Sequence, residues 1–483
     1  MTTRRLVILL TFLAIFAMAA RISVDTDTWW HLRAGQWILE HRALPSVDNF
    51  SYTRVGEPWL YPGWLVEVPM YLIYKYFGPG GLNIWTAVMV CLTFIFLWNA
   101  MSGGVFLRAF VLIFSAATAG IYWSARPQLI TLLFAAIYIW ILEGFRRRNA
   151  LTNPRRLWWL PLLMILWANI HGGFIIGFLI WGVYFVDAII RWKTGTITIG
   201  SLKSLLIIGC LMFMGVMINP GGASMLEYPL KTVQIKALQA YIQEWQSPNF
   251  HNLSVQPFAW LILTTLGVVG ASRRRIAFSD FLLSDGFIYM GLMAGRNIAL
   301  FALVAPLVIT RHAEPLIGQL SNRFNLKLTT SASRNKLYQV LNWLIIIILG
   351  IVVLFKVSTI IPNSINQQEF KKILPVAAVE YINIHQPPGR IFNSYNWGGY
   401  LLFKLPDYPV FVDGRTDLYS DLIINEWINV IQAGDGWQAI LDKWKINLIL
   451  IEPAHPIVCH LEREGWRLLF QDEVAVLYQR PPE

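Results

Sequence analysis

The sequence predicts a polytopic α-helical membrane protein with a small α/β domain at its C-terminal end. Of its 483 residues, 56% are hydrophobic and only 14% are charged, which is typical of chains that cross a bilayer several times. Long apolar runs recur as far as Lys356. From about Asn363 the chain becomes polar, and short β-rich runs alternate with helical patterns, as in a small α/β domain.

The apolar runs predict about eleven membrane-spanning helices. The first is Leu6–Ala20, which follows Arg4 and Arg5. We expect it to stay uncleaved, although the small residues around Ala19 would also suit a signal-peptide cleavage site. The other expected spans are Leu82–Met101, Val105–Trp123, Gln128–Gly144, Leu157–Ile170, Phe174–Ile190, Leu202–Ile218, Pro257–Ala271, Phe278–Ala294, Ile298–Ile309 and Tyr338–Lys356.

The distribution of basic residues predicts the orientation of these spans. With the N-terminus in the cytoplasm, the loops rich in Lys and Arg all become cytoplasmic, as the positive-inside rule requires. They are Gly144–Arg156, Arg191–Ser201, Ser272–Ala277 and Thr310–Lys336. The net charge of +11 is spread over these short clusters, which argues against nucleic-acid binding. We therefore expect a multi-pass protein of the cytoplasmic (inner) membrane.

Two domains follow from this topology. Residues 1–360 form the transmembrane domain, which includes a first extracytoplasmic loop over 24–81, and residues 361–483 form an extracytoplasmic α/β domain. Expected strands in the second domain are Gly389–Phe392, Pro409–Val412, Leu448–Ile451 and Val474–Tyr478, and expected helices are Ile423–Ala433 and Trp437–Trp444. The three cysteines have no disulfide or metal-binding spacing and are expected to be packing residues.

The start of the first loop is the strongest candidate for an active centre. Asp25 and Asp27 stand beside Trp30 and His31 directly after the first span, and charge next to hydrocarbon is costly to keep. Either Asp is a candidate general base or metal ligand. The alternatives are that Asp27 caps the helix that follows and that Asp25 is a solvated loop residue. His31 is a proton shuttle, a hydrogen-bond donor to a phosphate, or an interfacial packing residue.

The rest of this loop predicts two interfacial helices. One begins near Trp29, and the other covers Gly63–Phe77, which is too polar to span comfortably. Glu67 lies on the apolar face of the second helix, so we include it among the substrate-binding candidates. Asp48 follows a Pro-Ser pair, which is typical of a turn.

Four further candidates for substrate binding lie in or beside expected extracytoplasmic loops: Arg126, His171, Glu244 and Arg296. A guanidinium pairs bidentately with phosphate oxygens, so the two arginines suit a phosphate ligand. His171 stands where a span is interrupted, and such breaks usually line a cavity. The alternative for all four is an interfacial residue that extends toward the headgroups.

The densest motif of the tail is FNSYNWGGYLLFKLPDYPVFVDGRTD, residues 392–417. Gly398 and Gly399 suggest a tight turn or a close backbone approach. Asp413 and Arg415 follow an expected strand, where site residues are often found. The alternative for this pair is a turn closed by a salt bridge.

The chain resembles the GT-C superfamily of polytopic glycosyltransferases, including polyprenyl-phosphate-sugar-dependent mannosyltransferases and oligosaccharyltransferases. The matching features are the early acidic motif, the interfacial helices that follow it, the many-helix topology and the C-terminal extracytoplasmic domain. The chain also resembles a bacterial group of GT-C-like membrane proteins in the stretches DTDTWWHLRAGQWILEH, FSYTRVGEPW, WANIHGGF and VFVDGRTDLY. The resemblance implies that Asp25 or Asp27 is the base or a metal ligand, and that Mg or Mn is a candidate cofactor. At Tyr395–Tyr400 the acid of the oligosaccharyltransferase WWDYG motif is missing, with Asn396 in its place, so peptide acceptors are not implied.

These observations lead us to expect an inverting glycosyltransferase of the cell envelope. Its partners would be a polyprenyl-phosphate sugar donor and a lipid, glycan or protein acceptor on the extracytoplasmic side. The alternative is a non-enzymatic membrane protein, either a lipid-linked glycan transporter or an envelope-assembly scaffold.

Overall fold

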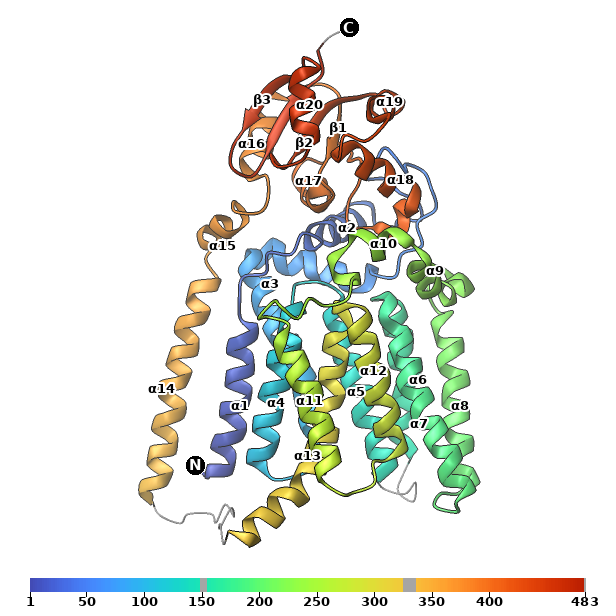
Figure 1. Ribbon diagram of the computed structural model, residues 1–483, viewed down its shortest axis with the longest axis vertical. Helices are drawn as coiled ribbons and strands as arrows, with labels where there is room; N and C mark the ends of the chain where they lie inside the picture. The colour runs from blue at the N-terminus through green and yellow to red at the C-terminus, as the bar shows by residue number, and fades with distance from the viewer. Residues whose placement is uncertain (148–153, 325–335, 482–483) are drawn as a thin grey trace.

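The computed structural model describes residues 1–147, 154–324 and 336–481. Figure 1 shows a bundle of long helices with a smaller sheet-containing layer above one end of it. Short helices and loops, drawn from the first loop and from the segment between α8 and α11, lie between the two layers. The site described below lies at this junction.

Each expected span coincides with a helix of the bundle. These helices are α1 (Thr3–Ala19), α3 (Trp64–Ala100), α4 (Val105–Ala119), α5 (Gln128–Arg147), α6 (Trp159–Ala168), α7 (Ile175–Lys193), α8 (Ile199–Val216), α11 (Gln256–Ala271), α12 (Phe278–Met293), α13 (Ile298–Arg323) and α14 (Lys336–Ile360). Within the described residues, seven helical segments are long and apolar enough to cross a membrane. The chain is therefore a polytopic helical membrane protein, and the count of eleven spans stays a prediction.

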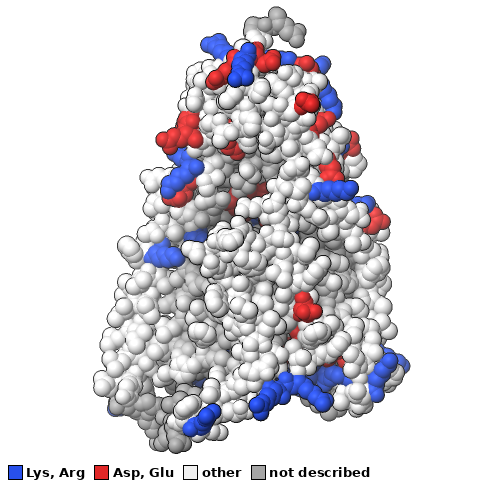
Figure 2. Space-filling view, in the orientation of Figure 1, with Lys and Arg blue, Asp and Glu red and all other residues white. Residues whose placement is uncertain are grey.

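The described residues of the basic loops lie together at one end of the bundle. Lys and Arg side chains line the lower edge of the molecule, while both signs of charge occur on the upper layer (Figure 2). The N-terminus lies at the same lower end (Figure 1). The predicted separation of basic loops from the first loop is thus present in the fold, as the positive-inside rule would require of cytoplasmic loops.

The first loop folds onto the opposite end of the bundle. Its first helix is α2 (Thr28–His41), which packs against α3. The predicted helix over Gly63–Phe77 is confirmed as the first part of α3. Gly78 then interrupts α3 with φ of 63°, a left-handed conformation that glycine adopts readily. This break lets one long element run across the bundle end and then turn into it.

The segment between α8 and α11 covers the same end with short helices. They are η4 (Gly222–Leu226), α9 (Tyr228–Gln234), α10 (Lys236–Tyr241) and η5 (Gln243–Trp245). The backbone N–H of Ala237 donates to Asp421 Oδ1 at 2.7 Å, which ties α10 to the tail. Another short turn, η6 (Gly295–Asn297), precedes α13.

The tail forms a four-stranded sheet flanked by helices. The strands are β1 (Arg390–Asn393), β2 (Ile446–Ile451), β3 (Arg467–Gln471) and β4 (Val476–Gln479), in the order β1-β2-β4-β3. Only the β1–β2 pair is parallel. The helices are α15 (Asn363–Phe370), α16 (Val376–His385), η7 (Tyr395–Trp397), α17 (Gly398–Lys404), α18 (Thr416–Ile431), α19 (Trp437–Lys443) and α20 (Ile457–Arg463).

One of the four strand predictions is wrong, and one strand was missed. Pro409–Val412 is not a strand of the sheet: Val410 forms an isolated bridge with Ser51 of the first loop, and Phe411 O accepts from Thr53 Oγ1 at 2.7 Å. This extended segment pairs with the loop instead of with another strand. The strand β3 was not expected. Its pattern, exposed at both ends and half-buried between, lacks the alternation that marks a half-buried strand.

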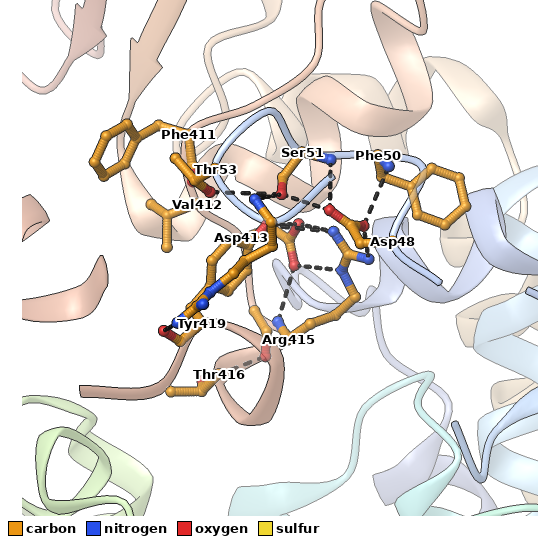
Figure 3. Close-up of polar contacts among 12 residues, drawn as sticks. Asp48, Phe50, Ser51, Thr53, Phe411, Val412, Asp413, Arg415, Thr416 and Tyr419 are labelled. Atoms are coloured by element: carbon orange, nitrogen blue, oxygen red, sulfur yellow. Dashed lines mark hydrogen bonds and ion pairs between the residues drawn. The ribbon is translucent and has the colours of Figure 1, made fainter. Parts of the chain in front are cut away.

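A buried ion network also fastens the tail to the first loop (Figure 3). Arg415 donates to Asp48 Oδ1 at 2.7 Å and to Asp413 Oδ2 at 2.7 Å. Tyr419 donates to the same Asp413 oxygen at 2.6 Å. Asp48 and Asp413 are fully buried and Arg415 is 1% exposed. The salt bridge expected as the alternative role of Asp413 and Arg415 is therefore present. Asp48 also closes the expected turn, because its side chain accepts from the N–H of Phe50.

We expect Arg415→Met to lower the thermal unfolding temperature sharply, because it leaves two carboxylates buried without their cation. The loss of stability should be about 3 to 5 kcal/mol, the usual effect of removing one partner of a buried pair. The measurement is thermal unfolding in detergent, together with limited proteolysis of the tail. Arg480→Met removes an exposed pair with Asp442 and should change the midpoint little; equal effects of the two variants would contradict the account.

Candidate functional site

A cavity of about 560 Å³ lies where the bundle, the first loop, the α9–η5 segment and the tail meet. Seven of the predicted site residues line it: Asp27, Trp30, His31, Arg126, His171, Glu244 and Arg296. They come from separate loops and helix ends that are far apart in the sequence. The folded chain therefore gathers most of the polar candidates into a single chamber.

Arg126 is the charge centre of this chamber. It lies in the turn between η1 (Gly120–Tyr122) and α5. Its guanidinium is 3.0 Å from Asp27 Oδ2, 3.3 Å from Asp25 Oδ2 and 3.4 Å from Glu244 Oε2. Burial opposes its charge, but the three carboxylates outweigh burial and raise the pKa of Arg126 well above its usual value. Arg126 therefore stays a cation and balances acids held beside an apolar bundle.

Asp27 is the acid that faces the cavity. It occupies the N-cap position of α2, as one alternative proposed, but its side chain makes no capping hydrogen bond. Instead its own N–H donates to Asp25 Oδ1 at 2.9 Å, and Asp25 lies just outside the cavity against Arg126. Burial, opposed by Arg126 and reinforced by nearby carboxylates, raises the pKa of Asp27 to about 7. Such a carboxyl group is a stronger base than an exposed one.

The tail closes tightly over Asp27. A Cβ added to Gly414 would lie 1.9 Å from Asp27 Oδ1 and 3.1 Å from Trp30 Nε1. The indole N–H of Trp30 is buried and has no partner among the described residues. A Cβ added to Gly399 would lie 3.0 Å from Thr26 O, so this glycine makes the close backbone approach that was one of the two expectations for the pair. Glycine is required here because the tail backbone passes directly over the predicted base.

His31 and Glu67 form a buried pair, in which His31 lines the cavity and Glu67 does not. His31 Nδ1 contacts Glu67 Oε1, and burial lowers the pKa of His31 well below its usual value, so its ring is neutral. Glu67 is fully buried in the first turn of α3 and lies behind His31, away from the cavity wall. This geometry suits an orienting role for Glu67, with His31 as the group that reaches the cavity.

His171 has a fixed tautomer. Its Nδ1 accepts from the Gly173 N–H at 3.0 Å and lies 2.8 Å from Thr131 Oγ1. Burial and the two nearby arginines lower the pKa of His171 to about 3, so the ring is neutral. With Nδ1 accepting, the single proton lies on Nε2. His171 can therefore donate one neutral hydrogen bond to a ligand in the cavity.

A second, more apolar cavity of about 260 Å³ adjoins the first between helices of the bundle. It is lined by side chains of α5, α7, α12 and α13, among them Leu132, Ile176, Met290 and Leu300. The two cavities share His171, Tyr228, Glu244 and Arg296 among their walls. A ligand with a charged head and an apolar tail would fit across this boundary.

Asp413 and Arg415 lie elsewhere. They belong to the buried network of Figure 3, and it is the intervening Gly414 and the following Thr416 and Asp417 that reach the cavity. Their predicted contact with a substrate stays untested. In this fold they position the Gly414 turn against Asp27.

Several wall residues were not predicted individually as site residues, among them Trp59, Tyr228, Tyr395, Thr416 and Asp417. The last three lie within the tail motif over residues 392–417. Tyr395 OH lies 2.5 Å from Thr416 Oγ1. Burial raises the pKa of Asp417, while a hydrogen bond from Tyr228 and the charge of Arg415 oppose the rise. Their positions depend on how the tail docks, which no local pattern encodes.

The site does not fit the divalent cation that the resemblance implied. Asp25, Asp27 and Glu244 all face Arg126, and its guanidinium takes the central position that a metal ion would need. Within the described residues, no group of three or more His, Cys, Asp or Glu side chains is arranged to hold a metal. We derive no reaction step through a metal ion.

Comparisons with known proteins place this fold. No family model matches the sequence, and no curated protein matches it. The solved structure of the archaeal oligosaccharyltransferase AglB from Archaeoglobus fulgidus, in complex with an inhibitory peptide and a dolichol-phosphate, matches with a TM-score of 0.56 at 10% identity, over 92% of this chain and 69% of that one.

Two other solved structures are similar over nearly the whole chain. ArnT from Cupriavidus metallidurans, bound to undecaprenyl phosphate, matches with a TM-score of 0.47 at 13% identity, over 98% of this chain and 97% of that one. Arabinofuranosyltransferase AftD from Mycobacteria matches with a TM-score of 0.49 at 13% identity, over 99% of this chain and 40% of that one. The likeness to AglB shows that this chain has the expected GT-C-like fold.

Proposed function

We propose that this protein is an inverting glycosyltransferase that takes its sugar from a polyprenyl-phosphate donor, with Asp27 as general base. The observation that carries the proposal is the position of Asp27. Its carboxyl group, with a pKa of about 7, faces a cavity that also holds Arg126 and Arg296 and adjoins an apolar cavity between helices. An acid, a phosphate-binding pair and an adjoining apolar space for the first part of a lipid chain are the parts this chemistry needs.

The donor would enter from the bilayer. Its isoprenoid chain would occupy the apolar cavity beside Leu132, Ile176 and Met290, and its phosphate would reach Arg296 and Arg126 at the boundary. The AglB structure, which holds a dolichol-phosphate, makes this lipid class the natural probe. A guanidinium is well suited to phosphate oxygens because its N–H groups pair with two of them at once.

The reaction would then be a single displacement at the anomeric carbon. The acceptor hydroxyl oxygen attacks that carbon while the bond to the phosphate oxygen breaks, and the polyprenyl phosphate leaves with the electron pair. Asp27 takes the hydroxyl proton. Arg126 and Arg296 stabilise the charge that grows on the leaving phosphate, and His171 Nε2 can add one hydrogen bond.

The acceptor would approach from the side of the tail. Asn396, Thr416 and Trp427 line that part of the cavity, and Trp59 of the first loop faces the same space. A lipid, a glycan or a protein acceptor would meet Asp27 there, on the extracytoplasmic side of the cytoplasmic membrane. The aromatic rings offer apolar faces of the kind that pack against sugar rings.

Transfer is favoured over the alternative of a transporter by where the cavities lie. Both are lined by residues from the end of the bundle that carries the first loop, and none of their lining residues belongs to the basic loops at the other end. A transporter of lipid-linked glycans would need a polar path that continues to that end.

We expect Asp27→Asn to reduce transfer about 10²- to 10⁴-fold, the usual contribution of a positioned base. Asp25→Asn should have a smaller effect, because Asp25 acts by holding Asp27 and Arg126. The measurement is transfer from a radiolabelled lipid-linked sugar in proteoliposomes. Glu40→Gln, an exposed acid at the other end of α2, is the control. Full activity in both Asp variants would rule out the proposed base.

The pH profile gives a second test of Asp27. The base must be deprotonated to act, and its pKa is raised to about 7. Wild-type transfer should therefore rise with pH through about 7 and level off above it. The residual activity of Asp27→Asn should lack this rise. A wild-type rate that falls over the same range would contradict the assignment.

Gly414→Ala tests whether the tail positions the base. The new Cβ would lie 1.9 Å from Asp27 Oδ1, so the carboxylate must move, and we expect turnover to fall about 10- to 100-fold, as for a misplacement of roughly 1 Å. Gly286→Ala, which meets nothing within 4 Å, is the matched control. Wild-type turnover in Gly414→Ala would show that the contact does not matter.

A further inference from the structure

The carboxylate of Glu244 lies between the two arginines of the cavity. Its Oε2 is 3.4 Å from Arg126 Nη1, and its Oε1 is 3.7 Å from Arg296 Nη1. One carboxylate thus faces two guanidiniums, with one oxygen toward each. Burial disfavours its charge, but the two arginines outweigh burial and lower the pKa of Glu244 below its usual value. Glu244 is an anion held in the place where a donor phosphate is expected.

Glu244 stands on a part of the chain that can release it. It belongs to η5, a single short turn between α10 and α11, and its side chain is 25% exposed. Trp245 places its ring 4.2 Å from the Arg296 guanidinium, and Gln246 O accepts from the Gly295 N–H. Among the described residues, the Glu244 carboxylate has polar contacts only with Arg126 and Arg296. A rotation of its side chain would therefore free Arg296 from its ion pair and open one side of Arg126, which stays paired with Asp25 and Asp27.

The charges of the site favour replacement of the Glu244 carboxylate by a donor phosphate over binding of both groups together. Asp25, Asp27 and Glu244 already surround Arg126. A phosphate added beside Glu244 would bring like charges together in a partly buried space, which is unfavourable. A sugar phosphodiester and a carboxylate each carry one negative charge, so replacing one by the other leaves the balance of the site unchanged.

We propose that Glu244 occupies the donor's phosphate subsite when no donor is bound, and that the phosphate of a polyprenyl monophosphate donor displaces it. This inference rests on the proposed function. It also predicts a monophosphate donor over a diphosphate donor. A single phosphoryl group can fill the space between Arg126 and Arg296 that the Glu244 carboxylate occupies, whereas a diphosphate would bring an additional negative charge. The apolar cavity shares Glu244 and Arg296 in its wall, which points to a lipid as the source of the phosphate.

The test is the binding of undecaprenyl phosphate to the full-length protein in nanodiscs, measured without acceptor or turnover. The measurement is made at about pH 5, where this phosphomonoester carries mainly one negative charge, as the sugar phosphodiester does. We expect Glu244→Gln to bind it about 10-fold or more tightly than wild type, since the variant keeps the shape and removes the competing charge. Arg296→Gln should weaken binding. Glu227→Gln, which removes an exposed acid of the same segment, should bind as wild type does.

Two further ligands distinguish the sources of the phosphate. Inorganic phosphate should compete weakly with undecaprenyl phosphate, and it should also bind more tightly to Glu244→Gln than to wild type. Undecaprenol, which lacks the phosphate, should bind equally to wild type and to Glu244→Gln. Equal or weaker binding of undecaprenyl phosphate to Glu244→Gln would overturn the inference, and Glu244→Ala guards against an effect peculiar to glutamine. If binding tightens but no sugar is transferred, the proposed transfer fails while the phosphate subsite stands.

Discussion

The site depends on one buried cation. Arg126 contacts Asp25, Asp27 and Glu244 at 3.0 to 3.4 Å, and without it three acids would lie close together at the edge of an apolar bundle. Under such conditions carboxyl groups take up protons, because both burial and mutual repulsion disfavour their charge. Arg126 opposes this effect: its charge helps to lower the pKa of Glu244 and limits the rise that burial gives the pKa of Asp27. The pKa of Asp27 is about 7, which is the range in which a general base is most useful.

The second constraint is the docking of the tail onto the first loop. Arg415 joins Asp48 of the loop to Asp413 of the tail in a fully buried network (Figure 3). That network brings Gly414 against Asp27 and Thr416 to the cavity wall. A buried ion pair adds little net stability to a fold, but it fixes the relative positions of the segments that carry it, because any misplacement leaves a buried charge unpaired. The tail is in this sense part of the site, although its polar motif does not itself face the cavity.

Much of the site could be predicted because charge at a membrane boundary is informative. Asp27 and His31 stood out beside the first apolar run, and Arg126, His171, Glu244 and Arg296 stood out at the ends of others. All six line the cavity. Charge alone could not tell which acid faces inward: Asp25 lies behind Arg126, and Glu67 lies behind His31.

The tail was harder to predict for a physical reason. Tyr228, Tyr395 and Asp417 reach the cavity only because two segments dock across a large separation in sequence, and no local pattern carries that information. The same docking explains why Pro409–Val412 is extended without joining the sheet, since its bridge partner is Ser51 in the first loop. The helices of the bundle could be predicted from hydropathy, whereas the segment that pairs with Pro409–Val412 could not.

The most direct test of this account is a structure of the full-length protein with undecaprenyl phosphate in nanodiscs. We predict that the phosphate lies between Arg126 and Arg296, with the Glu244 carboxylate displaced and the isoprenoid chain in the apolar cavity beside Ile176 and Met290. A phosphate bound at the opposite, basic end of the bundle, or a Glu244 carboxylate still seated between the two arginines, would contradict it.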